Sequence, residues 1–132
     1  LVKQAIARFA RRLIEDYQID TPGPETQMKG LSGGNLQKAL LAREISGAPR
    51  AMIAMQPTRG LDVGAIEAVH RLLMDLRRSG AAILLVSEEL EEITSLSDRI
   101  AVIYEGRIMD IVAREQATAE RLGLLMAGVT EG

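Results

Sequence analysis

Two short apolar runs separated by a helical segment constrain the fold of this chain more than any other feature of its sequence. Residues 51–55 and 81–86 are too short for a typical helix, and Gly or Pro residues lie near the ends of both runs. Between them, residues 63–79 repeat apolar side chains at helical spacing and are followed by Gly80. Strands and helices that alternate through short loops favour a parallel sheet with flanking helices. The sequence therefore predicts an α/β fold in which both runs are buried strands.

The part of the chain before these strands is expected to be largely helical. Residues 1–17 repeat apolar side chains every three or four positions, which is typical of one face of a helix. The Thr21-Pro22-Gly23-Pro24 run then interrupts regular structure, and a second helix is expected after it. We therefore assign residues 1–48 to part of a helical subdomain and residues 49–132 to part of an α/β core.

The part after the second strand carries three further signals. Ser87 is predicted to cap a short helix that begins at Glu88. Two strand-like runs, 99–104 and 107–112, flank a Glu-Gly pair and indicate a β-hairpin. Residues 115–126 have a helical pattern.

The composition excludes several classes of function. The net charge of −2 and the lack of clustered Lys and Arg provide no basic face for nucleic acid. No apolar run reaches the roughly 18 residues that span a bilayer, and the first residues lack the profile of a signal peptide. Contact with a membrane is therefore expected only through a protein partner. Without cysteine, the chain has no disulfides and no thiolate metal site.

A Ser-Gly-Gly sequence introduces the second predicted helix. Ser32 is a suitable N-cap, and the N–H groups of Gly33, Gly34 and Asn35 lie at the positive end of the helix dipole. Because glycine has no side chain, the backbone can approach a ligand closely here. Such a helix start suits a phosphate, whereas the alternative is that it serves only as a helix cap.

A longer string around these residues resembles a known family. Residues 31–38, Leu-Ser-Gly-Gly-Asn-Leu-Gln-Lys, are similar to the signature motif of ATP-binding cassette (ABC) ATPases, in the variant with Asn in the fifth place found in sugar and nucleoside importers. Residues 55–62, which end in Gly-Leu-Asp, resemble a second segment of that family. The resemblance extends from about Gln27 to Val112. It implies a parallel sheet of the P-loop NTPase type with flanking helices, together with a piece of the helical signature subdomain.

Three positions depart from the pattern of the family. In the family an Asp that helps to hold Mg²⁺ and a Glu that polarises the attacking water stand where this chain has Met55 and Gln56. A thioether is a poor ligand for a hard cation, and a neutral amide cannot accept the proton of water. Glu88 stands where the family usually carries His, and its carboxylate either repels a phosphate or stabilises the start of its own helix. The resemblance thus implies a degenerate half with no catalytic residue and no metal ligand of its own.

The phosphate-binding loop Gly-x-x-x-x-Gly-Lys-Ser/Thr does not occur in this sequence. The chain is therefore expected to be a fragment, the C-terminal part of one larger nucleotide-binding domain. Two such halves pair head to tail in the family. The resemblance then implies that Ser32, Gly33, Gly34, Asn35 and Asp62 meet ATP that the partner half holds with Mg²⁺. Because this site is expected to face outward, Gly34→Asp is predicted to impair it without unfolding the chain.

The resemblance also implies partners and a function. The chain is expected to belong to the ATP-binding component of an ABC importer for sugars or nucleosides and to be inactive as an ATPase alone. Its expected partners are the second ATPase half, upstream in the same polypeptide, the transmembrane permease subunits and, indirectly, an external solute-binding protein. This places it in the cytoplasm, on the inner face of the membrane. The alternatives are a slowly hydrolysing ABC ATPase half and a non-transport ABC protein that acts on nucleic acid or ribosomes, which the acidic balance disfavours.

Overall fold

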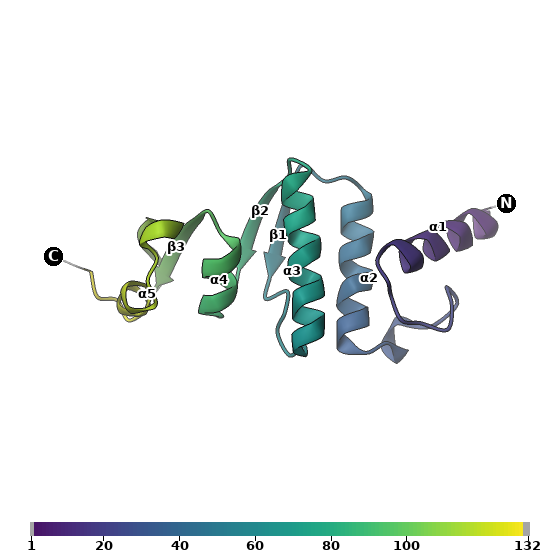
Figure 1. Cartoon of the computed structure of the whole chain (residues 1–132), viewed down its shortest axis with the longest axis horizontal. Helices are drawn as coiled ribbons and strands as arrows, with labels where there is room; N and C mark the ends of the chain where they lie inside the picture. The colour runs from purple at the N-terminus through teal and green to yellow at the C-terminus, as the bar shows by residue number, and fades with distance from the viewer. Residues whose placement is uncertain (1, 131–132) are drawn as a thin grey trace. The chain divides into compact units, whose positions relative to one another are not determined.

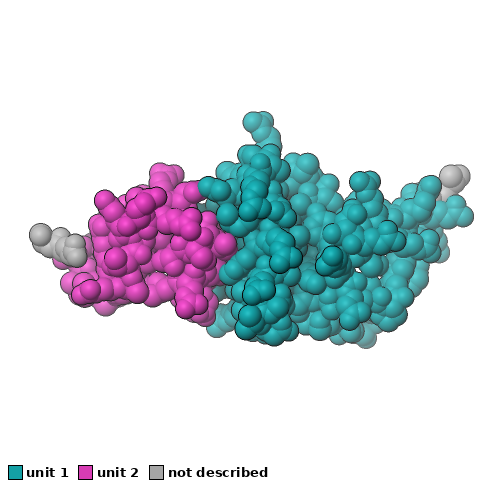
Figure 2. Space-filling view, in the orientation of Figure 1, with its two compact units in different colours: residues 1–84 teal, residues 85–132 magenta. Residues whose placement is uncertain are grey.

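The computed structural model describes residues 2–130 of the chain. They form two compact units that divide between residues 84 and 85, coloured separately in Figure 2. This division does not coincide with the predicted subdomain boundary between residues 48 and 49. That boundary concerns the layout of a whole nucleotide-binding domain and stays a prediction.

The first unit alternates helices and strands (Figure 1). Its elements are α1 (Val2–Asp16), the short 3-10 helix η1 (Met28–Gly30), α2 (Gly33–Ser46), β1 (Ala51–Met55), α3 (Val63–Arg78) and the beginning of β2 (Ala82–Val86). The strands β1 and β2 pair in a two-stranded sheet and run in the same direction, with α3 as the connection between them. The predicted α/β fold is therefore confirmed.

The two strands are less buried than predicted, because only one face of their sheet is covered. Burial alternates along β1, where Ala54 is buried while Ile53 and Met55 are 71% and 70% exposed. Leu84 of β2 is also exposed. Along α3 the buried residues are apolar and share one face, namely Val69, Leu73 and Leu76. A short apolar run thus predicted the strands correctly, but it did not reveal that one face of the described sheet carries exposed apolar side chains.

The apolar face of the first helix is largely exposed. The periodicity predicted α1 correctly, yet none of its described residues is buried. Val2, Ile6 and Phe9, which lie on the predicted apolar face, are 73%, 62% and 52% exposed. Further along the helix, Leu13 and Ile14 are half-buried and approach the segment that follows.

The second unit contains a hairpin packed against a helix. Its elements are α4 (Leu90–Leu96), β3 (Arg99–Tyr104), β4 (Arg107–Ala113), the short 3-10 helix η2 (Arg114–Gln116) and α5 (Ala119–Met126). β3 and β4 are antiparallel, as predicted. Glu105 and Gly106 between them have φ values of +47° and +75°, the left-handed geometry that a two-residue hairpin turn favours. The core of this unit consists of Ile100, Val102, Val112, Leu122 and Leu125.

The predicted start of α4 is wrong. The helix begins at Leu90 rather than Glu88, and its N-cap Glu89 makes no side-chain capping hydrogen bond. Ser87 Oγ instead accepts a hydrogen bond from the Glu89 N–H at 3.1 Å, which closes a local turn before the helix. Ser and Asp side chains favour such turns as readily as helix caps, and the sequence pattern does not separate the two.

Across residues 2–130, no helix has both the length and the apolar character needed to cross a lipid bilayer.

Candidate functional site

Ser32 caps α2, as predicted. Its backbone is extended, with φ −61° and ψ 158°, and its Oγ accepts a hydrogen bond from the Asn35 N–H at 3.3 Å. The first intrahelical hydrogen bond runs from the Leu36 N–H to the Ser32 carbonyl at 2.8 Å. The N–H groups of Gly33 and Gly34 therefore precede the helical ladder and have no acceptor within it. Because Ser32 and Gly33 are exposed, this end of α2 is accessible to a ligand.

The Asn35 side chain joins Ser32 to the turn that follows α1. Its Nδ2 donates to Ser32 Oγ at 3.0 Å, and its Oδ1 accepts from the Asp20 N–H at 2.9 Å. Lys38, one turn further along α2, donates from Nζ to the Gln18 carbonyl at 3.1 Å. Sequence reasoning assigned a role to the backbone of Asn35 alone and missed these two side-chain contacts. The Asn at this place of the motif was the available signal, but one of its two partners, Asp20, lies fifteen residues earlier in the chain.

Gly34 lies against α3. A Cβ added at Gly34 would be 2.8 Å from the Cβ of Ala65, closer than real Cβ contacts. A Cβ added at Gly33 would meet Leu61 Cδ2 at 3.5 Å, an ordinary van der Waals distance. The expectation that Gly34→Asp leaves the chain folded stays a prediction, but its premise that this position faces outward is wrong, because a side chain here must displace the backbone of α2 or α3. Gly34 allows the two helices to approach each other.

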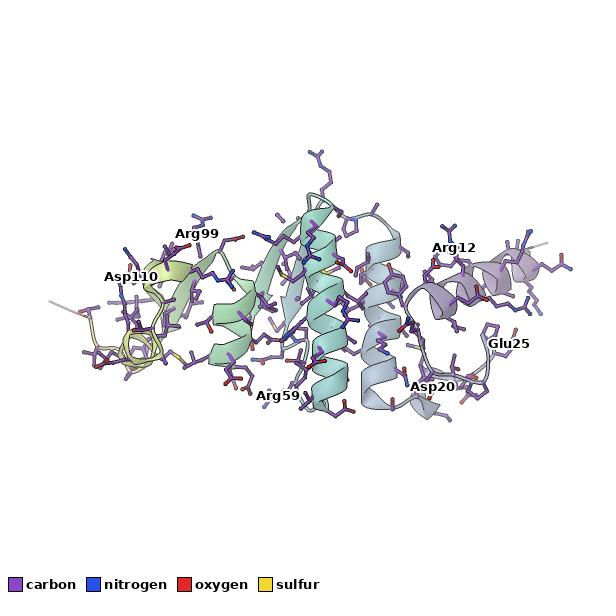
Figure 3. The ribbon with its side chains drawn as sticks, viewed as in Figure 1. Arg12, Asp20, Glu25, Arg59, Arg99 and Asp110 are labelled. Atoms are coloured by element: carbon purple, nitrogen blue, oxygen red, sulfur yellow. The ribbon has the colours of Figure 1, made fainter. Side chains whose placement is uncertain are left out.

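Asp62 caps the neighbouring helix. Its Oδ1 accepts a hydrogen bond from the Ala65 N–H at 2.9 Å, and its backbone is extended ahead of α3. Because Ala65 also contacts Gly34, the starts of α2 and α3 lie next to each other. The structure thus brings the segment that begins with Ser32 together with the segment around Asp62. Figure 3 labels Asp20 and Arg59, which lie at this same end of the first unit.

Met55 and Gln56 lie where β1 ends and the turn to α3 begins. The Met55 side chain is exposed, and Gln56 has a φ of +48°, in the left-handed region that Gln seldom adopts. The Gln56 carbonyl accepts from the Arg59 N–H at 3.3 Å, and the Thr58 carbonyl accepts from the Leu61 N–H at 3.1 Å. These bonds hold the turn that leads to Asp62. Neither Met55 nor Gln56 offers a carboxylate at the strand end.

Glu88 belongs to the second unit and is exposed. It precedes α4 by two residues and does not stabilise that helix as its N-cap, because Glu89 occupies that position. The expectation that Glu88 lies at the start of its own helix is therefore wrong, because α4 begins two residues later.

The donor set fits a phosphate better than a metal ion. The free N–H groups at the start of α2 and the exposed hydroxyl of Ser32 are hydrogen-bond donors, which suit anionic oxygen. Within the described part of the chain, no group of three or more His, Asp or Glu side chains has an arrangement that could hold a metal ion. Mg²⁺ requires oxygen ligands, and the strand end supplies a thioether and an amide.

The chain is similar in sequence to ATP-binding proteins of importers. No family model matches the chain. The chain is 55% identical over 131 residues to the guanosine import ATP-binding protein NupO of Bacillus subtilis (strain 168), covering 99% of the chain and 26% of that protein. It is 44% identical over 122 residues to the ribose import ATP-binding protein RbsA of the same strain, covering 92% of the chain and 25% of that protein. The chain thus spans about a quarter of the length of the curated relatives it matches.

A solved structure shares the fold. The dimeric, post-hydrolysis state of the ATP-binding cassette MJ0796, bound to ADP and Pi, superposes with a TM-score of 0.70 at 21% sequence identity. The match covers 81% of this chain and 46% of that one. At this identity the likeness concerns the fold alone.

Proposed function

From the premise that this chain belongs to the ATP-binding proteins of ABC importers for nucleosides and sugars, of which it spans a segment, we propose that it completes the ATP site of a partner half. Ser32 and the N–H groups of Gly33 and Gly34 contact the terminal phosphate of that ATP. Asp62, at the start of the adjacent helix, contacts the phosphate-binding loop of the partner half. The nucleotide itself is held with Mg²⁺ mainly by that half.

One observation carries this proposal. The starts of α2 and α3 are packed together through Gly34 and Ala65, so that the exposed Ser32 and Asp62 occupy one end of the unit. A helix start with free N–H groups attracts anionic oxygen, and a hydroxyl at its cap adds a donor. The similarity to import ATP-binding proteins suggests which anion binds here, since the relatives are named for ATP binding.

The proposal includes a half that does not hydrolyse ATP itself. Met55 replaces a possible Mg²⁺ ligand by a thioether, and Gln56 replaces a possible base by a neutral amide. Glu88 adds a carboxylate where a phosphate would have to approach. A half with these three residues contributes to its partner's site without needing catalytic groups of its own.

The proposed partners follow from the relatives. One relative is named for guanosine import and the other for ribose import, so the solute is a nucleoside or a sugar. The chain then acts on the inner face of the membrane beside the permease subunits, and an external protein delivers the solute to them. Closure of the paired halves on ATP changes the conformation of the permease. Nucleic acid has no role in this proposal.

Ser32→Asp in the full-length protein, assembled with its permease, tests the proposal. Asp is as good an N-cap as Ser, so α2 should remain intact, whereas a carboxylate would face the phosphate. Losing a charge-assisted hydrogen bond costs roughly 1.5–3 kcal/mol and repulsion adds to it, so we expect ATPase turnover to fall at least about a hundredfold. Ser32→Thr, which keeps the hydroxyl, should retain most of the turnover. Wild-type turnover in a folded Ser32→Asp transporter would show that Ser32 is only a helix cap.

A further inference from the structure

The hydroxyl of Ser32 receives two hydrogen bonds. The Asn35 N–H donates to its Oγ at 3.3 Å, and Asn35 Nδ2 donates to the same atom at 3.0 Å. A serine hydroxyl has two acceptor lone pairs and one hydrogen. When both lone pairs are engaged, the oxygen can take part in a further hydrogen bond only as a donor.

The orientation of the Asn35 amide follows from its other partner. The Asp20 backbone N–H is a donor and lies 2.9 Å from one atom of the amide, which must therefore be the oxygen. The opposite atom, which faces Ser32, must then be the nitrogen. Because that nitrogen can only donate, the direction of the contact with Ser32 is determined by a backbone group fifteen residues away.

Another cap in this chain lacks the second donor. Thr118, the N-cap of α5, accepts a hydrogen bond from the Arg121 N–H at 3.1 Å, and no side chain among residues 2–130 donates to its hydroxyl. Capping a helix thus requires only the backbone contact. The extra contact at Ser32 has another consequence, which is to orient the hydroxyl hydrogen.

We propose that Asn35 is a positioning residue that makes the Ser32 hydroxyl an obligate donor directed at the terminal phosphate of the nucleotide. This inference rests on the proposed function and deepens it, because it states how the phosphate is recognised. Without Asn35, the hydroxyl rotates and spends part of its time with its hydrogen turned away from the phosphate. The amide itself does not touch the nucleotide.

A double-mutant cycle in the full-length protein with its permease tests this role. The variants are Asn35→Ala, Ser32→Ala and the double variant, and the readout is kcat/KM for ATP hydrolysis. We expect Asn35→Ala to lower kcat/KM roughly tenfold when Ser32 is present and less than about twofold in the Ser32→Ala background. Affinity for a non-hydrolysable ATP analogue should fall likewise, while affinity for ADP, which lacks the terminal phosphate, should not change.

A matched control separates positioning from a general structural role. Lys38 ties the same turn to α2 through the Gln18 carbonyl but does not contact Ser32. If Asn35 serves only to hold that turn, Lys38→Met and Asn35→Ala should lower kcat/KM equally. Thermal unfolding of every variant reports whether it remains folded.

The outcomes distinguish the two proposals. If Ser32→Ala lowers kcat/KM and the effect of Asn35→Ala disappears in its presence, both proposals are supported. If Asn35→Ala has the same effect in both backgrounds, or the same effect as Lys38→Met, the positioning role is overturned and the function of Ser32 stands. If Ser32→Ala has wild-type kcat/KM, the proposed function fails and the positioning role with it.

Discussion

Gly33 and Gly34 are adjacent in the first turn of α2, yet the structure constrains them differently. A Cβ at Gly34 would lie 2.8 Å from the Cβ of Ala65, whereas a Cβ at Gly33 would be in ordinary contact with Leu61. Overpacking of this kind costs about 1–3 kcal/mol, so Gly34→Ala should lower the free energy of unfolding by that amount. Gly33→Ala should leave it within about 1 kcal/mol of wild type, because alanine favours helix. Urea unfolding of both variants measures the difference.

Removing the opposing methyl group provides the control for this prediction. Ala65→Gly in the Gly34→Ala background reopens the space between α2 and α3, so part of the lost stability should return even though glycine is a poor helix former. If Gly34→Ala were as stable as Gly33→Ala, the close approach of the two helices would not be what requires glycine at this position.

The residues of the site differ in how far the sequence could predict them. Ser32 was predicted as a helix cap because capping is local and depends on residues within one turn, and the same rule applies to Asp62, whose capping role was missed. The contact between Gly34 and Ala65 was not predictable, since it joins two helices and a strand intervenes between them in the sequence. The same holds for the bond from Asp20 to Asn35, which spans fifteen residues. Local rules predict the cap, whereas only the packing reveals what surrounds it.

At the level of elements, α5 shows how the chain ends a helix against a hairpin. The Gly128 N–H donates to the Leu125 carbonyl at 3.0 Å and the Val129 N–H to the Leu124 carbonyl at 2.9 Å, which closes the helix with Gly128 at φ +79°. A Cβ at Gly128 would lie 2.5 Å from the ring of Tyr104 in β3. The turn and the aromatic ring therefore both require glycine.

Gly128→Ala should destabilise the fold by at least about 2 kcal/mol, because it adds backbone strain and a steric clash. Gly123 is the matched control, since it is an exposed residue within α5 and no atom outside its own helix lies within 4 Å of an added Cβ. Gly123→Ala should stabilise the helix by roughly 0.5–1 kcal/mol. Thermal unfolding compares the two. If Gly128→Ala were as stable as wild type, α5 would not end against Tyr104.

The positions of most elements could be predicted, but their surroundings could not. Hydrophobic periodicity correctly predicted α1 and α3, and short apolar runs predicted the two strands of the first sheet, because both patterns depend only on local geometry. It also identified the apolar face of α1, on which Ile6 and Phe9 are exposed. Periodicity identifies an apolar face and carries no information on whether another segment covers it. The start of α4 was misjudged because a serine turn and a serine cap have similar sequences.

At the scale of the whole molecule, the proposal divides the work between this half and its partner. The strand end offers Met55 and Gln56 in place of carboxylates, while the starts of α2 and α3 keep the groups that a neighbouring nucleotide would meet. If this half does not hydrolyse ATP, the end of β1 should tolerate substitutions that would inactivate a catalytic site. The two sets of residues can therefore be tested separately in one assembled transporter.

Gln56→Ala in the full-length protein should leave ATPase turnover within about threefold of wild type, because a neutral amide does not act as a base. Gln and Ala are about equally strained at the φ of +48° observed for position 56, so the substitution should change the fold little. Gln56→Glu should likewise give no gain, since Met55 still supplies no oxygen ligand for Mg²⁺. Steady-state ATPase turnover of the wild type, Gln56→Ala and Gln56→Glu tests these expectations. A hundredfold loss in Gln56→Ala, the size expected for removing a catalytic base, would mean that Gln56 takes part in the chemistry.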